Sequence, residues 1–119
     1  MQIKIVIAGC RDYNNYPEAK AYLDSCITAM PENEYIILCG GCRGADMLGA
    51  RYAMEKGFKV EYYPAHWERY GKSAGLKRNF QMAQACDCVI CFWNGKSKGT
   101  KSMIEMAKQL SKPIRIKMV

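Results

Sequence analysis

The chain has 119 residues, half of them hydrophobic, which is enough for one compact domain with a buried core and too short for two. Its 18 lysines and arginines outnumber 11 acidic residues and give a formal net charge of +7, so we expect an anionic partner. No apolar run approaches the roughly 20 residues of a membrane-spanning helix. We therefore expect a soluble, cytoplasmic protein without a membrane partner.

The cysteines favour packing over metal binding. Seven is an odd number, and neither a secretion signal nor a disulfide-rich composition accompanies them, so we expect reduced thiols. Cys39 and Cys42 form a CxxC pair, and "CDCVIC" brings Cys86, Cys88 and Cys91 close in sequence. Alternate side chains of a strand face opposite ways, so Cys88 and Cys91 should not share a face. We predict no metal and no other cofactor.

Strand-like and helix-like segments alternate along the whole chain. Segments rich in β-branched and aromatic residues lie at 3–9, 35–40, 59–65, 88–93 and 113–119. Helical patterns lie between them at 17–30, 45–56, 73–86 and 100–110. This alternation predicts a single Rossmann-like, three-layer α/β domain over residues 1–119, with a five-stranded parallel sheet in the order 3-2-1-4-5.

Unusual residues follow the predicted strands rather than precede them. The strand-to-helix segments read "GCRDYNNY", "GGCRGAD", "PAHWERYGKSAGLKRN" and "NGKSKGT", whereas the helix-to-strand joins "EKGFK" and "LSKP" are short and ordinary. Ligands of open α/β sheets bind at the carboxyl ends of the strands, where the strand order reverses. We therefore expect the functional site at this rim of the sheet.

The composition of these segments favours a phosphate-bearing ligand. Glycines allow close backbone approach, and the N–H groups at the start of a helix attract anions. Basic side chains surround the predicted rim, and Trp67 and Trp93 offer rings on which a base can stack. Two alternatives remain open: Asp46 either stabilises the start of its helix or contacts ligand hydroxyls, and Trp93 belongs either to the core or to a ligand wall.

Four motifs resemble a known family. "GCRDY", "GGCRGAD", "PAHWERYGKSAGLKRNFQMA" and "FWNGKSKGTKSMIEMA" are similar, in order and spacing, to the YspA group of the SLOG superfamily of Rossmann-like proteins. The resemblance implies a nucleotide or nucleotide-derived ligand, such as an ADP-ribose-like or NAD-like compound, held by the glycine-containing loops. Transferred residue by residue, it points to Gly9, Arg11, Gly40, Gly41, Arg43, Gly44, Asp46, Ser97, Gly99 and Thr100.

A more distant resemblance is to the LOG-type phosphoribohydrolases. "RNFQM" is similar to their RKxxM motif and places Arg78 at the position of the arginine that they use. The second motif, GGxGTxxE, is not matched, because Met103 stands in place of the glutamate and the nearest carboxylate is Glu105. Hydrolysis of a glycosidic bond requires a carboxylate. The candidate catalytic residues are therefore Arg78, Asp46 and Glu105.

We predict a module that binds a nucleotide-derived ligand at the rim, as a sensor, sequestering or carrier protein, with an N-glycosidic hydrolase as the alternative. Nucleic-acid binding is a third hypothesis that rests on charge alone, so nucleic acid is not the expected partner. Whether the chain forms a homo-oligomer, and whether it is an enzyme, stay open. The remaining expected binding residues are Asp12, Trp67, Lys72, Arg78, Asn79 and Trp93.

Overall fold

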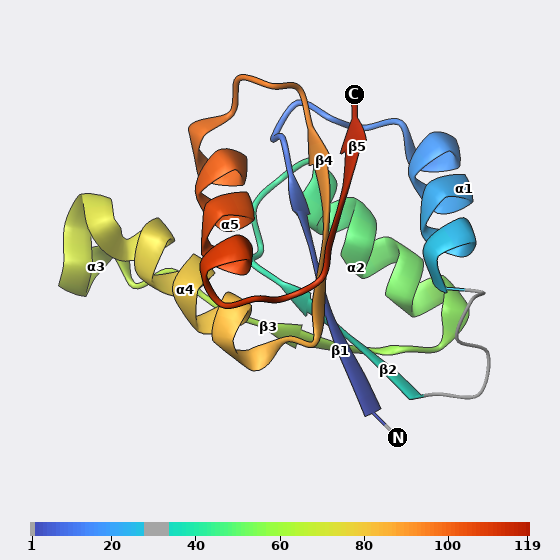
Figure 1. The fold of residues 1–119 in the computed structure, drawn as a ribbon, viewed down its shortest axis with the longest axis horizontal. Helices are drawn as coiled ribbons and strands as arrows, with labels where there is room; N and C mark the ends of the chain where they lie inside the picture. The colour runs from blue at the N-terminus through green and yellow to red at the C-terminus, as the bar shows by residue number, and fades with distance from the viewer. Residues whose placement is uncertain (1, 28–33) are drawn as a thin grey trace.

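The fold is a five-stranded parallel sheet between two layers of helices (Figure 1). A computed structural model describes residues 2–27 and 34–119. Within them the sheet runs in the order β3-β2-β1-β4-β5, which confirms the predicted fold class and strand order. The strands are β1 (Gln2–Gly9), β2 (Glu34–Cys39), β3 (Lys59–Tyr62), β4 (Cys88–Trp93) and β5 (Ile114–Met118).

Two helices cover each face of the sheet (Figure 1). On one face lie α1 (Tyr16–Ile27) and α2 (Ala45–Lys56); on the other lie α4 (Ala74–Ala85) and α5 (Lys98–Gln109). Residues 28–30 of the first predicted helix lie outside the described residues. The sequence did not predict the short helix α3 (Trp67–Tyr70) and the 3-10 turn η1 (Gly71–Ser73), which project beside α4.

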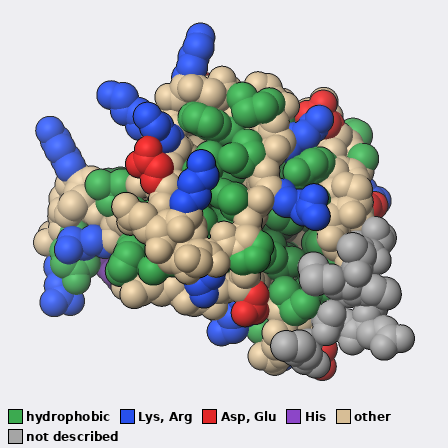
Figure 2. Space-filling view, in the orientation of Figure 1, with side chains coloured by type: hydrophobic (Ala, Val, Ile, Leu, Met, Phe, Trp, Pro, Cys, Tyr) green, Lys and Arg blue, Asp and Glu red, His purple; other side chains and the backbone are tan. Residues whose placement is uncertain are grey.

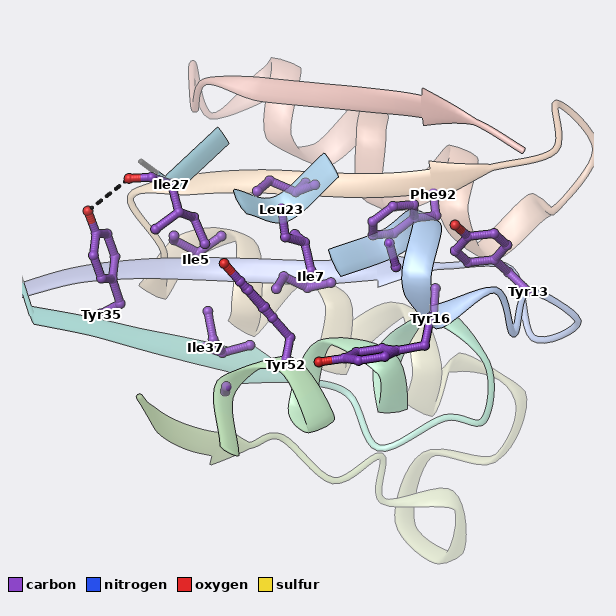
Figure 3. Close-up of a cluster of buried hydrophobic side chains, with 14 of the residues drawn as sticks. Ile5, Ile7, Tyr13, Tyr16, Leu23, Ile27, Tyr35, Ile37, Tyr52 and Phe92 are labelled. Carbon is purple, nitrogen blue, oxygen red and sulfur yellow. Dashed lines mark hydrogen bonds between the residues drawn. The ribbon is translucent and has the colours of Figure 1, made fainter. Parts of the chain in front are cut away.

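The core is buried on both faces of the central strands, as the apolar runs of a parallel sheet require. Ile5 and Ile7 of β1 pack with Leu23, Tyr52 and Phe92 on the side of α1 and α2 (Figure 3). The alternate residues of β1 and its neighbours pack against α4 and α5; this second cluster includes Val6, Leu38, Cys91, Met82 and Met103. Each fully buried aliphatic side chain contributes about 1.5 to 3 kcal/mol.

The positions where helices begin define the carboxyl rim. The first turn of α5 is capped by Ser97, whose Oγ accepts hydrogen bonds from the Thr100 N–H at 3.4 Å and the Thr100 hydroxyl at 3.0 Å. α2 and α5 lie on opposite faces of the sheet, yet both begin at this rim, directly after β2 and β4. Both helix N-termini therefore face the same edge.

The start of α2 is locked against the loop that follows β1. Gly44 has φ 81° and ψ −133°, and the Ala45 N–H donates to the Cys10 carbonyl at 3.1 Å. A Cβ at Gly44 would overlap the Cys10 carbonyl oxygen and lie 2.5 Å from that of Arg11. This glycine serves the contact between two rim loops, and the N–H group beside it is already occupied.

None of the helices in the described part of the chain has the length and apolar character needed to cross a lipid bilayer.

We expect Gly44→Ala to cost at least about 3 kcal/mol of unfolding free energy, because backbone strain and overlap with two carbonyls add together. Gly57→Ala is the matched control: Gly57 also has positive φ, at 75°, but nothing lies within 4 Å of its Cβ position. That variant should lose only about 1 kcal/mol. Urea denaturation measures both, and equal losses would contradict the packing role of Gly44.

Candidate functional site

A pocket of about 440 Å³ opens at the carboxyl rim of the sheet. Its walls come from the end of β1 and the loop after it, the loop after β2 and the first turn of α2, the middle of α4, and the loop into α5 with the first turns of that helix. We call it the rim pocket. The predicted residues that line it are Gly9, Arg11, Asp12, Asp46, Arg78, Asn79, Ser97, Gly99 and Thr100, and the lining residues outside the predicted set are Ala8, Cys10, Cys42, Asn94, Lys96 and Met103.

A second pocket of about 360 Å³ adjoins the first and includes the exposed aromatic residues Tyr62 and Trp67. We call it the aromatic pocket; it is lined by Gly40, Gly41, Cys42, Tyr62, Tyr63, Pro64, Ala65, Trp67 and Arg78. Three predicted residues, Gly40, Gly41 and Trp67, therefore lie here rather than in the rim pocket. Arg78 and Cys42 line both pockets.

The other predicted residues line neither pocket: Arg43, Gly44, Lys72, Trp93 and Glu105. Trp93 packs against the core, and its Nε1–H donates to the Ser97 carbonyl at 3.1 Å. Arg43 is exposed and lies 3.7 Å from the Asp12 carboxylate. Met103, which stands at the position of the glutamate in the GGxGTxxE motif, lines the rim pocket and makes this part of its wall apolar. Glu105 is exposed on α5 and does not line the pocket.

The Arg78 guanidinium is a buried connection between α4 and the loop after β2. Arg78 is 7% exposed, and its Nη1 donates to the Gly40 carbonyl. Its Nε–H donates to Asn79 Oδ1 at 2.9 Å, and its Nη2 lies 3.6 Å from the Cys42 sulfur. These contacts use three of the five N–H groups of the guanidinium. Arg78 thus positions the wall between the two pockets, and Arg11 and Lys96 are the exposed cations of the rim pocket.

Asp46 places a buried carboxylate in the floor of the rim pocket. It is 5% exposed, and its Oδ2 accepts from the Cys42 N–H at 3.4 Å. Burial raises the pKa of Asp46 to about 6, although Arg78, the N–H groups of Cys42 and Gly9, and Arg11 oppose this rise.

Gly40 allows the acidic and basic groups to meet at one point of the backbone. A Cβ there would lie 2.7 Å from Asp46 Oδ2 and 2.8 Å from Arg78 Nη1. Asp46 of α2 and Arg78 of α4 therefore both lie close to Gly40, and the absence of a side chain at this glycine leaves room for both.

The loop into α5 is shaped by its own side chains. Asn94 Oδ1 accepts from the N–H groups of Lys96 at 2.8 Å and Ser97 at 2.9 Å. The Asn94 N–H lies 3.2 Å from the Cys10 sulfur, which joins this loop to the loop after β1. Lys96 and the N-terminus of α5 are thereby held beside the pocket without a ligand.

The cysteines of this region are packing residues. Burial raises the pKa of Cys39 to about 11 and that of Cys91 to about 12, so both thiols stay protonated at neutral pH. Among the described residues, no group of three or more His, Cys, Asp or Glu side chains is arranged to hold a metal ion.

Comparison with known proteins identifies sequence relatives. The model of the YspA, cpYpsA-related SLOG family (YAcAr) matches residues 3–70. The chain is also 36% identical over 85 residues to the Gene 61 protein of Mycobacterium phage D29, a match that spans 66% of this chain and 68% of the phage protein. The predicted family is confirmed.

Solved structures share the fold at low sequence identity. DNA processing protein A (DprA) from Helicobacter pylori, described by its single-stranded DNA binding mode, matches 96% of this chain with a TM-score of 0.72 and 19% identity. DprA from Streptococcus pneumoniae matches 98% with a TM-score of 0.75 and 18% identity. The protein TM1055 matches 96%, with a TM-score of 0.67, 21% identity and 72% of that chain covered. The matches span 64% and 50% of the two DprA chains.

The expectation of a small nucleotide-derived ligand, with nucleic acid as an unexpected partner, is wrong. Two of the solved structures that share this fold along nearly the whole chain are DNA processing proteins, and one is described by its single-stranded DNA binding mode. The physical reason for the error is that a nucleotide and a DNA strand present the same phosphate, so glycine loops, helix N-termini and basic residues do not distinguish them.

We expect Asp46→Asn to remove a pH dependence of stability. Because the folded-state pKa of Asp46, about 6, exceeds its value of 3.8 as a free side chain, its contribution to stability is present near pH 4 and is lost as the pH rises through 6. The unfolding free energy of the wild type, relative to the variant, should fall by about 2 to 3 kcal/mol between those values. Urea denaturation across this range measures it; a difference that rises with pH would show that Arg78 dominates over burial.

Proposed function

The chain belongs to the YspA, cpYpsA-related SLOG family, and from that premise we propose that it binds single-stranded DNA across the carboxyl rim of its sheet. The observation that carries the proposal is the adjacency of the rim pocket and the aromatic pocket, which share Arg78 and Cys42. Proteins that bind single strands combine basic surface along the backbone with aromatic rings on which bases stack. Here the two features lie side by side.

Phosphates would be held at the mouth of the rim pocket. Arg11 approaches it from the loop after β1, and Lys96 from the loop before α5. The N-terminus of α5 adds the partial positive charge of its unpaired N–H groups. Lys and Arg side chains also project on the α3-to-α5 side of the molecule, to the left in Figure 2. The net charge of +7 supports this assignment.

Bases would stack in the aromatic pocket. Trp67 is 52% exposed and Tyr62 is 55% exposed, and exposed apolar side chains that share one pocket mark an interaction site. They come from different elements, α3 and β3, but line the same pocket. Stacking of a base on such a ring contributes about 1 to 3 kcal/mol. Support also comes from the single-stranded DNA binding mode of H. pylori DprA, which shares the fold.

We place this activity in the cytoplasm. All seven cysteines have free thiols, and a reducing compartment is where such a chain is expected.

We expect the protein to bind fluorescein-labelled dT20 in a fluorescence anisotropy titration, and Arg11→Ala or Lys96→Ala to weaken binding about 10-fold each. A plot of the logarithm of the binding constant against the logarithm of the salt concentration should become less steep by about 0.7 for each phosphate that a variant no longer neutralises. Lys108→Ala is the charge-matched control, because Lys108 lies in the last turn of α5, at the other end of the helix from the pocket. The proposal fails if the folded protein does not bind the strand at low salt, or if Lys108→Ala weakens binding as much.

Trp67→Ala should weaken dT20 binding by roughly 5- to 100-fold while leaving the salt slope unchanged, because stacking releases no counterions. Met54→Ala, which removes a side chain that is 74% exposed on α2, is the control for removal of exposed apolar surface. Quenching of tryptophan fluorescence on DNA binding would disappear in Trp67→Ala. Full quenching in that variant would contradict stacking on Trp67.

A further inference from the structure

Resting on the proposed function, we infer that the rim pocket receives one unstacked base of the bound strand, guanine in preference, and that Asp46 reads it by accepting hydrogen bonds from its Watson–Crick edge. The inference goes beyond strand binding because it assigns base selectivity to a pocket and a residue. It concerns a base within a strand, whose phosphates stay at the pocket mouth.

The Asp46 carboxylate disfavours a phosphate beside it in the interior of the rim pocket. Asp46 lines this pocket and is almost fully buried. Its pKa of about 6 leaves the carboxylate mainly ionised at pH 7.5. Two anions in a poorly solvated space repel each other strongly. The buried cation Arg78 balances the charge of Asp46, and its guanidinium is bound to Gly40, Asn79 and Cys42. The free cations Arg11 and Lys96 are exposed, so phosphates are held outside and the interior is left for a neutral group that donates hydrogen bonds.

The Asp46 carboxylate has acceptor capacity to spare. An ionised carboxylate accepts about four hydrogen bonds. The Cys42 N–H, at a long 3.4 Å, and the Gly9 N–H account for two. Arg78 is bound to Gly40, Asn79 and Cys42, and within the described part of the chain it forms no direct ion pair with Asp46. The carboxylate is therefore fixed in position but not saturated.

A hydrogen-bond donor lines the same pocket as this acceptor. Asn79 also lines the rim pocket, and its Oδ1 accepts from the Arg78 Nε–H. This bond orients the amide and leaves its NH2 group as a donor. Ala8 and Met103 provide apolar wall that suits the faces of a ring. The volume of about 440 Å³ lies in the range of sites for small organic groups.

The pairing of an acceptor with a donor matches guanine among the four bases. Its Watson–Crick edge presents two adjacent donors, N1–H and N2–H, beside the O6 acceptor. A carboxylate takes both donors at once, and an amide NH2 reaches O6. Adenine and cytosine each offer a single donor group on this edge, and thymine offers one N–H between two carbonyls, which would face the carboxylate. Sequence-specific recognition of single strands commonly uses this edge.

The test compares dT15 strands that carry one central dG, dA or dC with unmodified dT15, by anisotropy at pH 7.5 and fixed salt. We expect the dG strand to bind roughly 10-fold more tightly than the others, as one bidentate base contact provides. Central deoxyinosine, which lacks N2–H, should lose most of this preference. Central 7-deazaguanine, which keeps the Watson–Crick edge, should retain it.

The ratio of dG-strand to dT15 affinity in each variant isolates the role of Asp46 from any general weakening of binding. The ratio should fall to about 1 in Asp46→Asn, whose folding is checked by urea denaturation, and Asp46→Ser provides a second variant. Glu105→Gln, which removes an exposed carboxylate of α5, should keep the full ratio.

The outcomes separate the two proposals. If dT15 binds but all four central bases give equal affinity, the base-reading inference is overturned and strand binding stands. If the preference for dG persists in Asp46→Asn and Asp46→Ser, Asp46 is not the reader and the inference is overturned. If the folded protein binds none of the strands, the proposed function itself fails.

Discussion

The buried guanidinium of Arg78 is the contact on which the carboxyl rim depends. It joins α4 to the loop after β2, two segments far apart in the sequence, through the Gly40 carbonyl and the Cys42 sulfur. A buried charge is stable only when its hydrogen bonds are satisfied, so the loop must keep the shape that supplies them. That shape in turn presents the Cys42 N–H to Asp46 and forms the wall between the two pockets.

Charge is separated by depth at this rim. The ionisable groups inside are Asp46 and Arg78, which are buried and held in place by protein contacts, whereas Arg11 and Lys96 at the mouth are exposed to solvent. Buried groups are costly to rearrange, and exposed ones adapt at little cost. The interior is thus suited to discriminate between bases. The mouth is suited to attract the phosphates of a strand of any sequence.

Much of the fold was predictable because its signals are local. Five apolar segments and the helical patterns between them determine the α/β class, and the right-handed crossover rule limits the strand order. The short helix α3 was missed because four residues carry no periodicity. The role of Arg78 was missed because its partner Gly40 is 38 residues away, and no spacing along the chain reports that contact. Asn94 was not among the predicted site residues, although its side chain shapes the loop into α5.

The central position of β1 has a consequence for synthesis. β1 pairs with β2 through Ile5 and Ile37, and with β4 through Ile7 and Ile90, so one of its neighbours is translated more than eighty residues later. A nascent chain that ends before β4 leaves one edge of the apolar strand β1 unpaired and one sheet face without α5. Such non-local parallel pairing is slow, and open edges invite aggregation. The sheet can therefore close only after β4 and β5 have been synthesised and have left the ribosome.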